Sequence, residues 1–446
     1  MRALVSVSDK TGLVPFVQGL QALGWTIIAT GGTQKLLESS GVKTVGISEV
    51  TGFPEILDGR VKTLHPKVHG GILARRDLPA HMQTLAEQGI ETIDLVCVNL
   101  YPFRQTIARE GVSMEDAIEN IDIGGPSMVR SAAKNWRDVT IVCDPADYGK
   151  VLAELKENGK TSDQTRLQLS AKAYTHTAEY DACIATYMRA QAGLNEKLFL
   201  EYDLKQGLRY GENPHQAAKF YAAMQPAPYS LAFAKQIQGK ELSYNNIQDA
   251  NAALNVLRDF SDKPFCVALK HMNPCGAAVG ATIEEAGQAA YEADKVSIYG
   301  GIVGVNRELT AEVARGMKPI FLEIVIAPSF TPEALEILST KKNLRVLEVP
   351  MQREAQAPMQ YVGVNGGMLA QQLDTAMEPV NAEMCVTKVK PTAAQLADLD
   401  FGWRIVKHIK SNAIAVVRDN HTIGVGAGQT NRVGSAEIAL KEAQAA

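Results

Sequence analysis

The sequence has little cysteine, and none of it is paired at short range. Its 446 residues include six cysteines, with no C-x-x-C spacing among them. This excludes a zinc ribbon and a thioredoxin-like redox motif, and it is typical of a reducing compartment. No charged-then-apolar leader precedes the first strand-like segment, so we expect a cytoplasmic protein.

Long apolar runs and a surplus of positive charge are also missing. One of the longest apolar runs, residues 95–100, is far below the roughly 20 residues that a membrane helix needs. Lys and Arg total 45 against 49 Asp and Glu, so there is no basic field to hold a polynucleotide. We therefore expect a soluble globular protein of two or three domains that binds neither membrane nor nucleic acid.

The N-terminal part alternates short β-branched runs with helix-like segments. We expect strands at 2–7, 25–29, 44–47, 93–98 and 139–143, and helices at 12–23, 33–39 and 126–133. This order predicts an α/β domain with a parallel sheet. Polar motifs follow three of these strands, and they should meet at the carboxyl edge of the sheet: Ser8-Asp9-Lys10, Thr30-Gly31-Gly32-Thr33 and Asn99-Leu100-Tyr101.

Thr30 to Thr33 lies between a strand and a helix. Bare backbone amides and a helix dipole at such a place favour an anion such as phosphate. The alternative is a plain tight turn with a threonine N-cap.

Residues 60–70 concentrate positive charge. Arg60-Val61-Lys62-Thr63 opens a stretch that also contains Lys67 and two histidines, which favours an anionic ligand, although a solvated basic loop has the same composition. His65 and His69 have the spacing of zinc ligands, but Pro66 intervenes and no central acid is present, so we expect no metal.

Residues 121–127, which include Asp122 and Ile123, read as a second strand-end turn. Pro126 then suits the first turn of a helix that carries Lys134 at its far end. A lysine in that position is commonly only a solvated charge that complements the helix dipole.

The C-terminal half reads as a second unit. Residues 147–191 have a helical composition, which predicts a helical connector over 147–200. Beyond it we expect strands at 265–269 and 324–327 and a helix at 283–294. Lys270 and His271 follow the first of these strands, where catalytic groups are common, although a core histidine beside a snorkelling lysine is the alternative. Pro274-Cys275 is half of a zinc-deaminase motif, but its second cysteine is missing.

Read in order, these motifs resemble the bifunctional formyltransferase/IMP cyclohydrolase family of purine biosynthesis. The matching stretches are Ser6 to Gly12, Thr30 to Thr33, Thr51 to Glu55, Arg60 to Pro66, Asn99 to Phe103, Ala132 to Asn135 and Lys270 to Gly276. The resemblance implies a methylglyoxal-synthase-like cyclohydrolase domain at 1–146, the connector at 147–200, and a zinc-free, cytidine-deaminase-like transformylase domain at 201–446.

For the first domain the resemblance implies ring closure of a formamidoimidazole carboxamide ribotide (FAICAR) to inosine monophosphate (IMP). Lys134 would donate and accept the proton, with Tyr101 nearby. The implied nucleotide-binding residues are Ser8, Asp9, Lys10, Thr30, Gly31, Gly32, Thr33, Arg60, Val61, Lys62, Thr63, Asn99, Leu100, Asp122 and Ile123.

For the second domain it implies formyl transfer from 10-formyltetrahydrofolate to the aminoimidazole carboxamide ribotide (AICAR), without a metal and in a homodimer with shared sites. His271 would accept the amine proton, Lys270 would stabilise the oxyanion, and Val433 would contact folate. The implied ribotide-binding residues are Arg209, Tyr210, His271, Gly300, Glu323, Asn412 and Arg432, where Glu323 replaces an aspartate of some relatives.

The family continues beyond the position of Val433 through a further section that this chain lacks. We therefore expect an impaired transformylase. Two alternatives remain open: a cyclohydrolase whose second unit only dimerises, and a non-catalytic module that binds phosphorylated metabolites.

Overall fold

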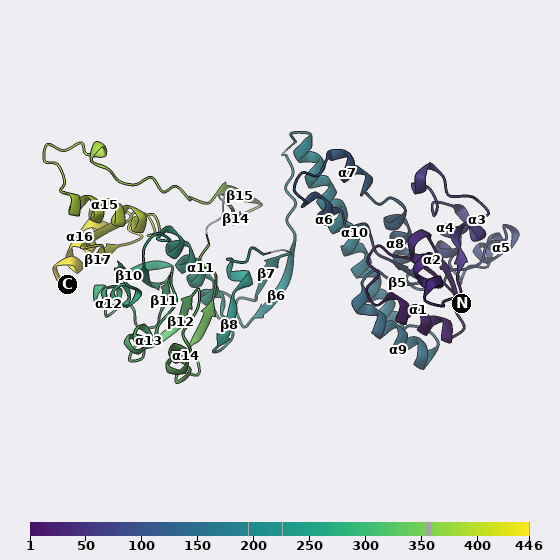
Figure 1. Cartoon of the computed structure of the whole chain (residues 1–446), viewed down its shortest axis with the longest axis horizontal. Helices are drawn as coiled ribbons and strands as arrows, with labels where there is room; N and C mark the ends of the chain where they lie inside the picture. The colour runs from purple at the N-terminus through teal and green to yellow at the C-terminus, as the bar shows by residue number, and fades with distance from the viewer. Residues whose placement is uncertain (195, 225, 353–357, 446) are drawn as a thin grey trace. The chain divides into compact units, whose positions relative to one another are not determined.

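The computed structural model describes residues 1–194, 196–224, 226–352 and 358–445. These residues form two compact units, Met1–Leu200 and Glu201–Ala446 (Figure 1). Each unit has its own sheet and its own core, so the two are described separately.

Unit 1 is built on a five-stranded parallel sheet with the order β3-β2-β1-β4-β5. Its strands are β1 (Arg2–Ser6), β2 (Thr26–Ala29), β3 (Val45–Gly46), β4 (Leu95–Val98) and β5 (Thr140–Val142). The predicted parallel sheet is therefore confirmed. The strand order changes direction between β1 and β4, and ligands of such sheets bind beyond the carboxyl ends of the strands at that point.

Helices cover both faces of this sheet. They are α1 (Leu13–Ala22), α2 (Gly31–Ser39), α3 (Ile47–Thr51), α4 (Pro66–Leu73), α5 (Pro79–Glu87), α6 (Phe103–Ile107), α7 (Met114–Glu119) and α8 (Gly124–Lys134). The helix predicted at 126–133 is thus α8, which begins two residues earlier. One prediction is wrong: residues 121–123 follow a helix rather than a strand, because Ser113 caps α7 by accepting a hydrogen bond from Asp116 N.

Residues 147–200 belong to unit 1. They form α9 (Tyr148–Asn158) and α10 (Asp163–Gln191), and α10 packs along α8 (Figure 1). Ser170 Oγ donates to Ala133 O over 2.8 Å, and Arg166 Nε donates to Trp136 O over 3.0 Å. The predicted helices are present, but they complete the first unit instead of standing apart as a connector. Neither α10 nor any other helix in the described ranges is both long enough and apolar enough to cross a bilayer.

Unit 2 contains an eight-stranded mixed sheet with the order β16-β17-β10-β9-β11-β12-β13-β8. The β11–β12 and β12–β13 pairs of this sheet are parallel, and the other neighbouring strands pair antiparallel. The strands are β8 (Lys235–Gln238), β9 (Phe265–Lys270), β10 (Asn273–Val279), β11 (Gly301–Val305), β12 (Leu322–Ala327), β13 (Arg345–Glu348), β16 (Ile414–Arg418) and β17 (His421–Gly426). The strands predicted at 265–269 and 324–327 are β9 and β12.

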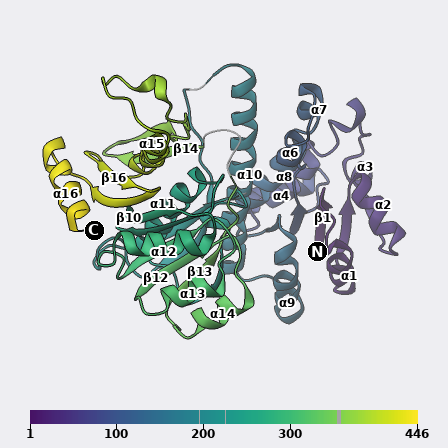
Figure 2. The same cartoon turned by 60° about the vertical axis from the view of Figure 1, so that its left-hand side comes forward.

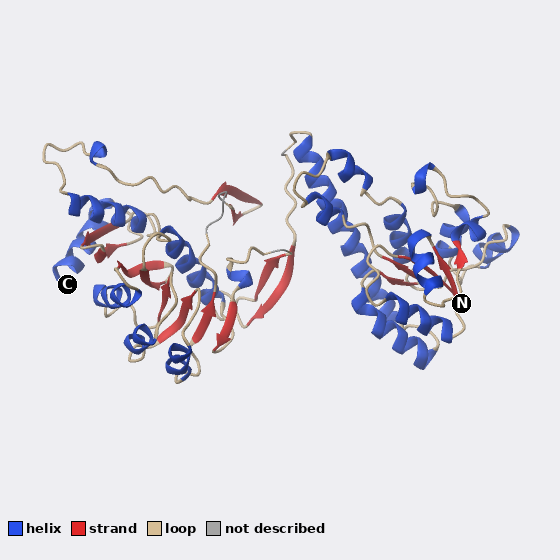
Figure 3. Cartoon of the chain, in the orientation of Figure 1, coloured by secondary structure: helices blue, strands red, loops and turns tan. Residues whose placement is uncertain are grey.

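Helices lie on the two faces of this sheet (Figures 2 and 3). One face carries α12 (Ile283–Ala293), α13 (Ala311–Met317) and α14 (Pro332–Ser339), and the other carries α11 (Tyr244–Asp259) and α15 (Ala393–Val406). A last helix, α16 (Arg432–Ala445), packs on β17. Two antiparallel hairpins lie outside the sheet: β6 (Tyr202–Leu208) with β7 (Ala218–Ala223), and β14 (Met359–Val364) with β15 (Gly367–Gln372).

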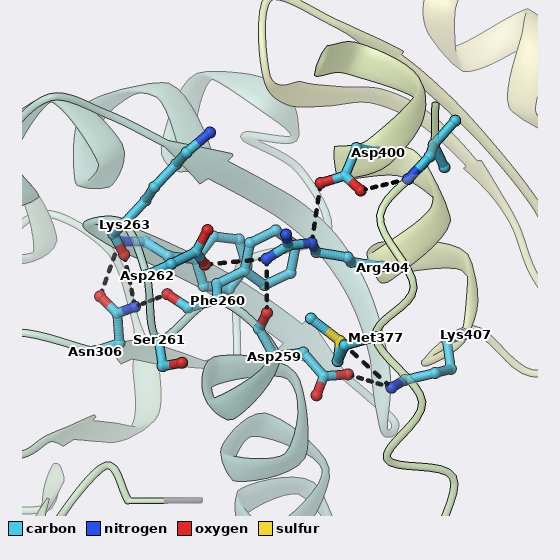
Figure 4. A network of polar contacts seen from close by, with 12 residues as sticks. Asp259, Phe260, Ser261, Asp262, Lys263, Asn306, Met377, Asp400, Arg404 and Lys407 are labelled. Carbon is cyan, nitrogen blue, oxygen red and sulfur yellow. Dashed lines mark hydrogen bonds and ion pairs between the residues drawn. The ribbon is translucent and has the colours of Figure 1, made fainter. Parts of the chain in front are cut away.

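A buried polar network fixes α15 to the end of α11 (Figure 4). Arg404 lies 3.0 Å from the Asp262 carboxylate and also donates to Asp259 O. The Asp259 carboxylate, which is only 6% exposed, accepts from Lys407 Nζ over 2.5 Å and lies 2.8 Å from His408 Nε2. Two segments far apart in the sequence are therefore joined by charge as well as by apolar packing.

Candidate active site

A cavity of about 590 Å³ opens in unit 1 beyond the carboxyl ends of β1, β2 and β4. Its size suits a small ligand such as a mononucleotide. It brings together most of the residues predicted for the nucleotide site: Ser8, Lys10, Thr30, Gly31, Gly32, Thr33, Arg60, Lys62, Thr63, Asn99, Tyr101, Asp122 and Ile123.

Asn99 joins the ends of two neighbouring strands. Its Oδ1 accepts from Ser8 N over 2.6 Å and from Asp9 N over 3.0 Å, while its Nδ2 donates to Asp9 O over 2.9 Å. The loop after β1 is thereby held against the end of β4. An amide side chain is needed at this position, because it must accept and donate at once.

The N-terminus of α2 is left open toward the cavity. Thr30 Oγ1 lies 2.6 Å from Ser6 Oγ, and Thr33 Oγ1 bonds to the backbone of Val7 at 3.1 Å. No side chain caps the helix, so the predicted alternative of a threonine cap is not observed. Gly31 adopts a positive φ of 41°, and a Cβ built on Gly32 would meet no atom within 4 Å. An uncapped helix start of this kind favours an anion, and Lys62 Nζ lies 4.0 Å from the Cβ position of Gly31.

Asp122 lies at the N-terminus of a second helix, α8. Its Oδ1 accepts from Gly125 N over 2.8 Å, and the backbone N–H of Tyr101 also donates to the carboxylate. Burial raises the pKa of Asp122, whereas these two hydrogen bonds and the charge of Lys62 act in the opposite direction. A carboxyl group with a raised pKa beside a cation in a polar cavity is a candidate for proton transfer.

Four predicted site residues do not line this cavity. The Asp9 carboxylate accepts from Thr11 N and Oγ1, which lowers the pKa of Asp9, and Val61 pairs with Ile56. Leu100 is buried in the core. Lys134 is exposed at the last residue of α8, and ten residues of helix separate it from Gly124 by about 15 Å. Lys134 is therefore not among the residues that line this cavity.

Several lining residues were not predicted as site residues. Gly124 and Gly125 belong to the turn predicted at residues 121–127, but they were not predicted to line a site. Their position depends on the start of α8, which was predicted two residues later than it is observed. Glu119 forms an ion pair with Arg60, and no local pattern indicates this contact because 59 residues separate the two.

The two histidines of the basic stretch have local partners. His65 Nδ1 accepts from Lys67 N and caps α4, and His69 Nδ1 lies 3.0 Å from Ser131 Oγ. Burial lowers the pKa of His69. Across the described ranges, no three side chains of His, Cys, Asp or Glu are grouped as metal ligands would be.

In unit 2, Lys270 and His271 lie at the end of β9. Lys270 Nζ donates to Tyr299 O over 2.6 Å, next to Gly300. His271 and Met272 have positive φ values of 51° and 64°, which are uncommon for residues other than glycine and mark a constrained turn. Asp249 Oδ1 holds this turn by accepting from Met272 N over 2.7 Å.

Asp249 is a second titratable group at this turn. Burial raises the pKa of Asp249, while the Met272 hydrogen bond and the charge of His271 act against burial. No sequence pattern indicated Asp249, because it is an ordinary polar position within α11.

The remaining transformylase residues lie in several places. Asn273 Oδ1 accepts from Lys410 N over 3.0 Å, which brings the segment of Asn412 to the Lys270–His271 turn. Glu323 pairs with Arg345 at 2.6 Å and lines a cavity of about 510 Å³. Arg209 lies over the Tyr210 ring, and Arg432 and Val433 begin α16. Within the described ranges, no hydrogen bond or ion pair joins Lys270 or His271 to Arg209, Tyr210, Arg432 or Val433.

Comparison with known proteins agrees with the two units. Residues 132–442 match the family model of the AICARFT/IMPCHase bienzyme, and residues 12–127 match that of the MGS-like domain. The chain therefore belongs to the AICARFT/IMPCHase bienzyme family. It is a bifunctional enzyme of purine biosynthesis with AICAR formyltransferase and IMP cyclohydrolase activities.

Its relatives are similar over almost the whole chain. The "Bifunctional purine biosynthesis protein PurH" of Streptococcus thermophilus is 58% identical over 99% of this chain and 87% of that protein. The protein of the same name from Bacillus cytotoxicus is 56% identical over the same shares. A solved structure, the crystal structure of ForH, is 41% identical and covers 42% of this chain and 95% of its own, with a TM-score of 0.39.

Proposed function

We propose that the unit 1 cavity binds FAICAR and closes its ring to form IMP. The phosphate lies at the open N-terminus of α2, where the amides of Gly31 and Gly32 and the ammonium groups of Lys10 and Lys62 surround it. The base then extends toward Asn99, Asp122 and Ile123. Lys62 supports this orientation, because its Nζ lies 4.0 Å from the Cβ position of Gly31 and a phosphate there would meet both the ammonium group and the helix amides.

Ring closure joins two groups of one bound molecule. The carboxamide nitrogen attacks the formyl carbon, a C–N bond forms, and the formyl oxygen becomes an oxyanion. The C–O bond then breaks and the ring C=N bond forms, and the oxygen leaves as water with the proton returned by Asp122 and the proton of the formamido N–H. Asp122 accepts the proton of the nitrogen, and the N-terminus of α8 stabilises the oxyanion. Tyr101, which lines the cavity, lies beside this path. Holding the two groups face to face supplies much of the rate enhancement.

The observation that carries this proposal is the position of Asp122, with its raised pKa, between Lys62 and the N-terminus of α8. Asp122→Asn keeps the shape of the side chain but removes the base. We expect its kcat for cyclisation to fall by about 100-fold or more, the usual size of a general acid–base contribution.

The matched comparison is Lys134→Ala, since Lys134 is the residue to which the family resemblance gives the proton transfer. Because Lys134 lies outside the cavity, we expect its kcat to change by less than about threefold. IMP formation from FAICAR, followed by absorbance, measures both variants. If Lys134→Ala lowers kcat more than Asp122→Asn does, Lys134 and not Asp122 is the proton-transfer residue.

In unit 2 we propose formyl transfer from the cosubstrate 10-formyltetrahydrofolate to AICAR at the Lys270–His271 turn. His271 accepts the proton of the attacking amine, and Lys270 stabilises the oxyanion. The constrained backbone of the turn and its hydrogen bond to Asp249 support this role, because both fix the orientation of the two side chains. Arg209, Tyr210, Gly300, Glu323, Asn412 and Arg432 are proposed for the ribotide, and Val433 for folate.

We also propose that the protein is a cytoplasmic homodimer whose transformylase sites are shared between subunits. In the described ranges, no hydrogen bond or ion pair ties Arg209, Tyr210, Arg432 or Val433 to Lys270 or His271, and a partner subunit could supply such residues to the site. Light scattering of the purified protein would measure the dimer mass.

A further inference from the structure

The long helix α10 reaches the backbone of Asp122, a residue that lines the cyclisation cavity, through the hydroxyl group of Tyr180. Tyr180 Oη accepts from Asp122 N over 2.8 Å and donates to Asn120 O over 3.2 Å. The Tyr180 side chain is 9% exposed, and burial raises its pKa to about 12, so the hydroxyl stays protonated at neutral pH. Its two hydrogen bonds therefore fix the backbone of residues 120–122.

The same tyrosine also packs against the segment that follows Tyr101, a residue that lines the cavity. Its ring meets Phe103 edge-on, with centroids 6.3 Å apart, and Phe103 is 1% exposed. Phe103 follows Tyr101 closely, and the Tyr101 backbone N–H donates to the Asp122 carboxylate. Tyr180 thus holds both segments that orient Asp122.

We infer that Tyr180 is a positioning residue for ring closure, and that α10 completes the cyclohydrolase site. This inference rests on the proposed role of Asp122. Helix α10 lies outside the MGS-like match of residues 12–127 and inside the bienzyme match of residues 132–442. The cyclisation site therefore depends on a helix that the MGS-like segment alone does not contain.

The hydrogen bonds of Tyr180 also affect the pKa of Asp122, because they keep its backbone buried. The groups that act on the carboxyl group are Lys62 and the backbone amides of Gly125 and Tyr101, while those that face Tyr180 include Asp122, Asp181 and Tyr101. If residues 120–122 relax into solvent, the burial that raises the pKa of Asp122 is lost. The pKa then falls toward its ordinary value.

Tyr180→Phe tests this inference because it removes only the hydroxyl and keeps the ring on Phe103. We expect kcat for cyclisation to fall by about tenfold or more with KM changed less than threefold, and the acidic limb of the pH–kcat profile to move to lower pH. A role in folding alone would lower the melting temperature without moving that limb. Formyl transfer by the same protein should remain within twofold of the unchanged chain.

Tyr187→Phe is the matched control. Tyr187 lies two turns further along α10 and meets the same Phe103 ring edge-on at 5.7 Å, but in the described ranges its hydroxyl has no hydrogen bond. Its kinetics should match those of the unchanged protein. If Tyr180→Phe keeps the original kcat and pH profile while Asp122→Asn is inactive, the inference about Tyr180 is wrong and the proposed function stands. If Asp122→Asn is itself fully active in cyclisation, the proposed role of Asp122 is wrong, and the inference about Tyr180 is wrong with it.

Discussion

Gly125→Ala should disable the cyclisation site by a single methyl group. A Cβ at Gly125 would lie 2.3 Å from Asp122 Oδ2 and 2.8 Å from its Cγ. Ordinary contact requires about 3.4 Å, so the carboxylate and the first turn of α8 must separate by about 1 Å. The hydrogen bond from Gly125 N, now 2.8 Å, would then exceed the usual limit of about 3.2 Å.

The expected loss follows from that bond. A hydrogen bond to a charged group contributes about 1.5–3 kcal/mol, and each 1.4 kcal/mol is a factor of ten in rate, so kcat/KM for FAICAR should fall by about 10- to 150-fold. Stability should change less, because alanine favours a helix over glycine by up to about 1 kcal/mol and offsets part of the strain.

The assay compares Gly125→Ala with Gly149→Ala. Gly149 lies in the first turn of α9, where a new Cβ would meet no atom within 4 Å. Both variants should unfold near the temperature of the unchanged protein, and only Gly125→Ala should lose cyclisation. A folded Gly125→Ala protein with kcat/KM within twofold of the original would refute the assigned role of the Asp122 carboxylate.

The remaining predictions concern unit 2. Burial acts to raise the pKa of Asp259, but hydrogen bonds from His408 and Lys407 lower it below its ordinary 3.8. The Asp259 carboxylate therefore stabilises the fold above about pH 4, and this contribution is lost as the pH falls through the lower pKa of the folded state. Asp259→Asn should therefore cost about 3 kcal/mol in urea unfolding at pH 7 and show a flatter decline below pH 4; equal slopes would contradict the assignment. Lys270→Ala and His271→Ala should each abolish formyl transfer and leave cyclisation within twofold, since both residues belong to a separate unit with its own core; loss of both activities would mean that the sites are not independent.

The elements of unit 1 were predictable because their signals are local. β1, β2 and β4 are short apolar runs, α1 places Leu13, Phe16, Val17 and Leu20 on one buried face, and the strand-end motifs could meet only at the carboxyl edge. The start of α8 and the helix α7 before it were missed. They depend on caps and turns that compete closely in energy.

The sequence by itself determined the parallel sheet and the family, and it predicted an anion site after β2, since each rests on residue types at fixed spacing along the chain. Only the tertiary structure decided that residues 147–200 pack into unit 1, that Lys134 lies outside the cavity, and that Tyr180 and Asp249 reach the two proposed sites. These facts depend on contacts between residues about 20 to 60 positions apart. No periodicity in the chain records such contacts, because they form only when helices and strands pack against one another.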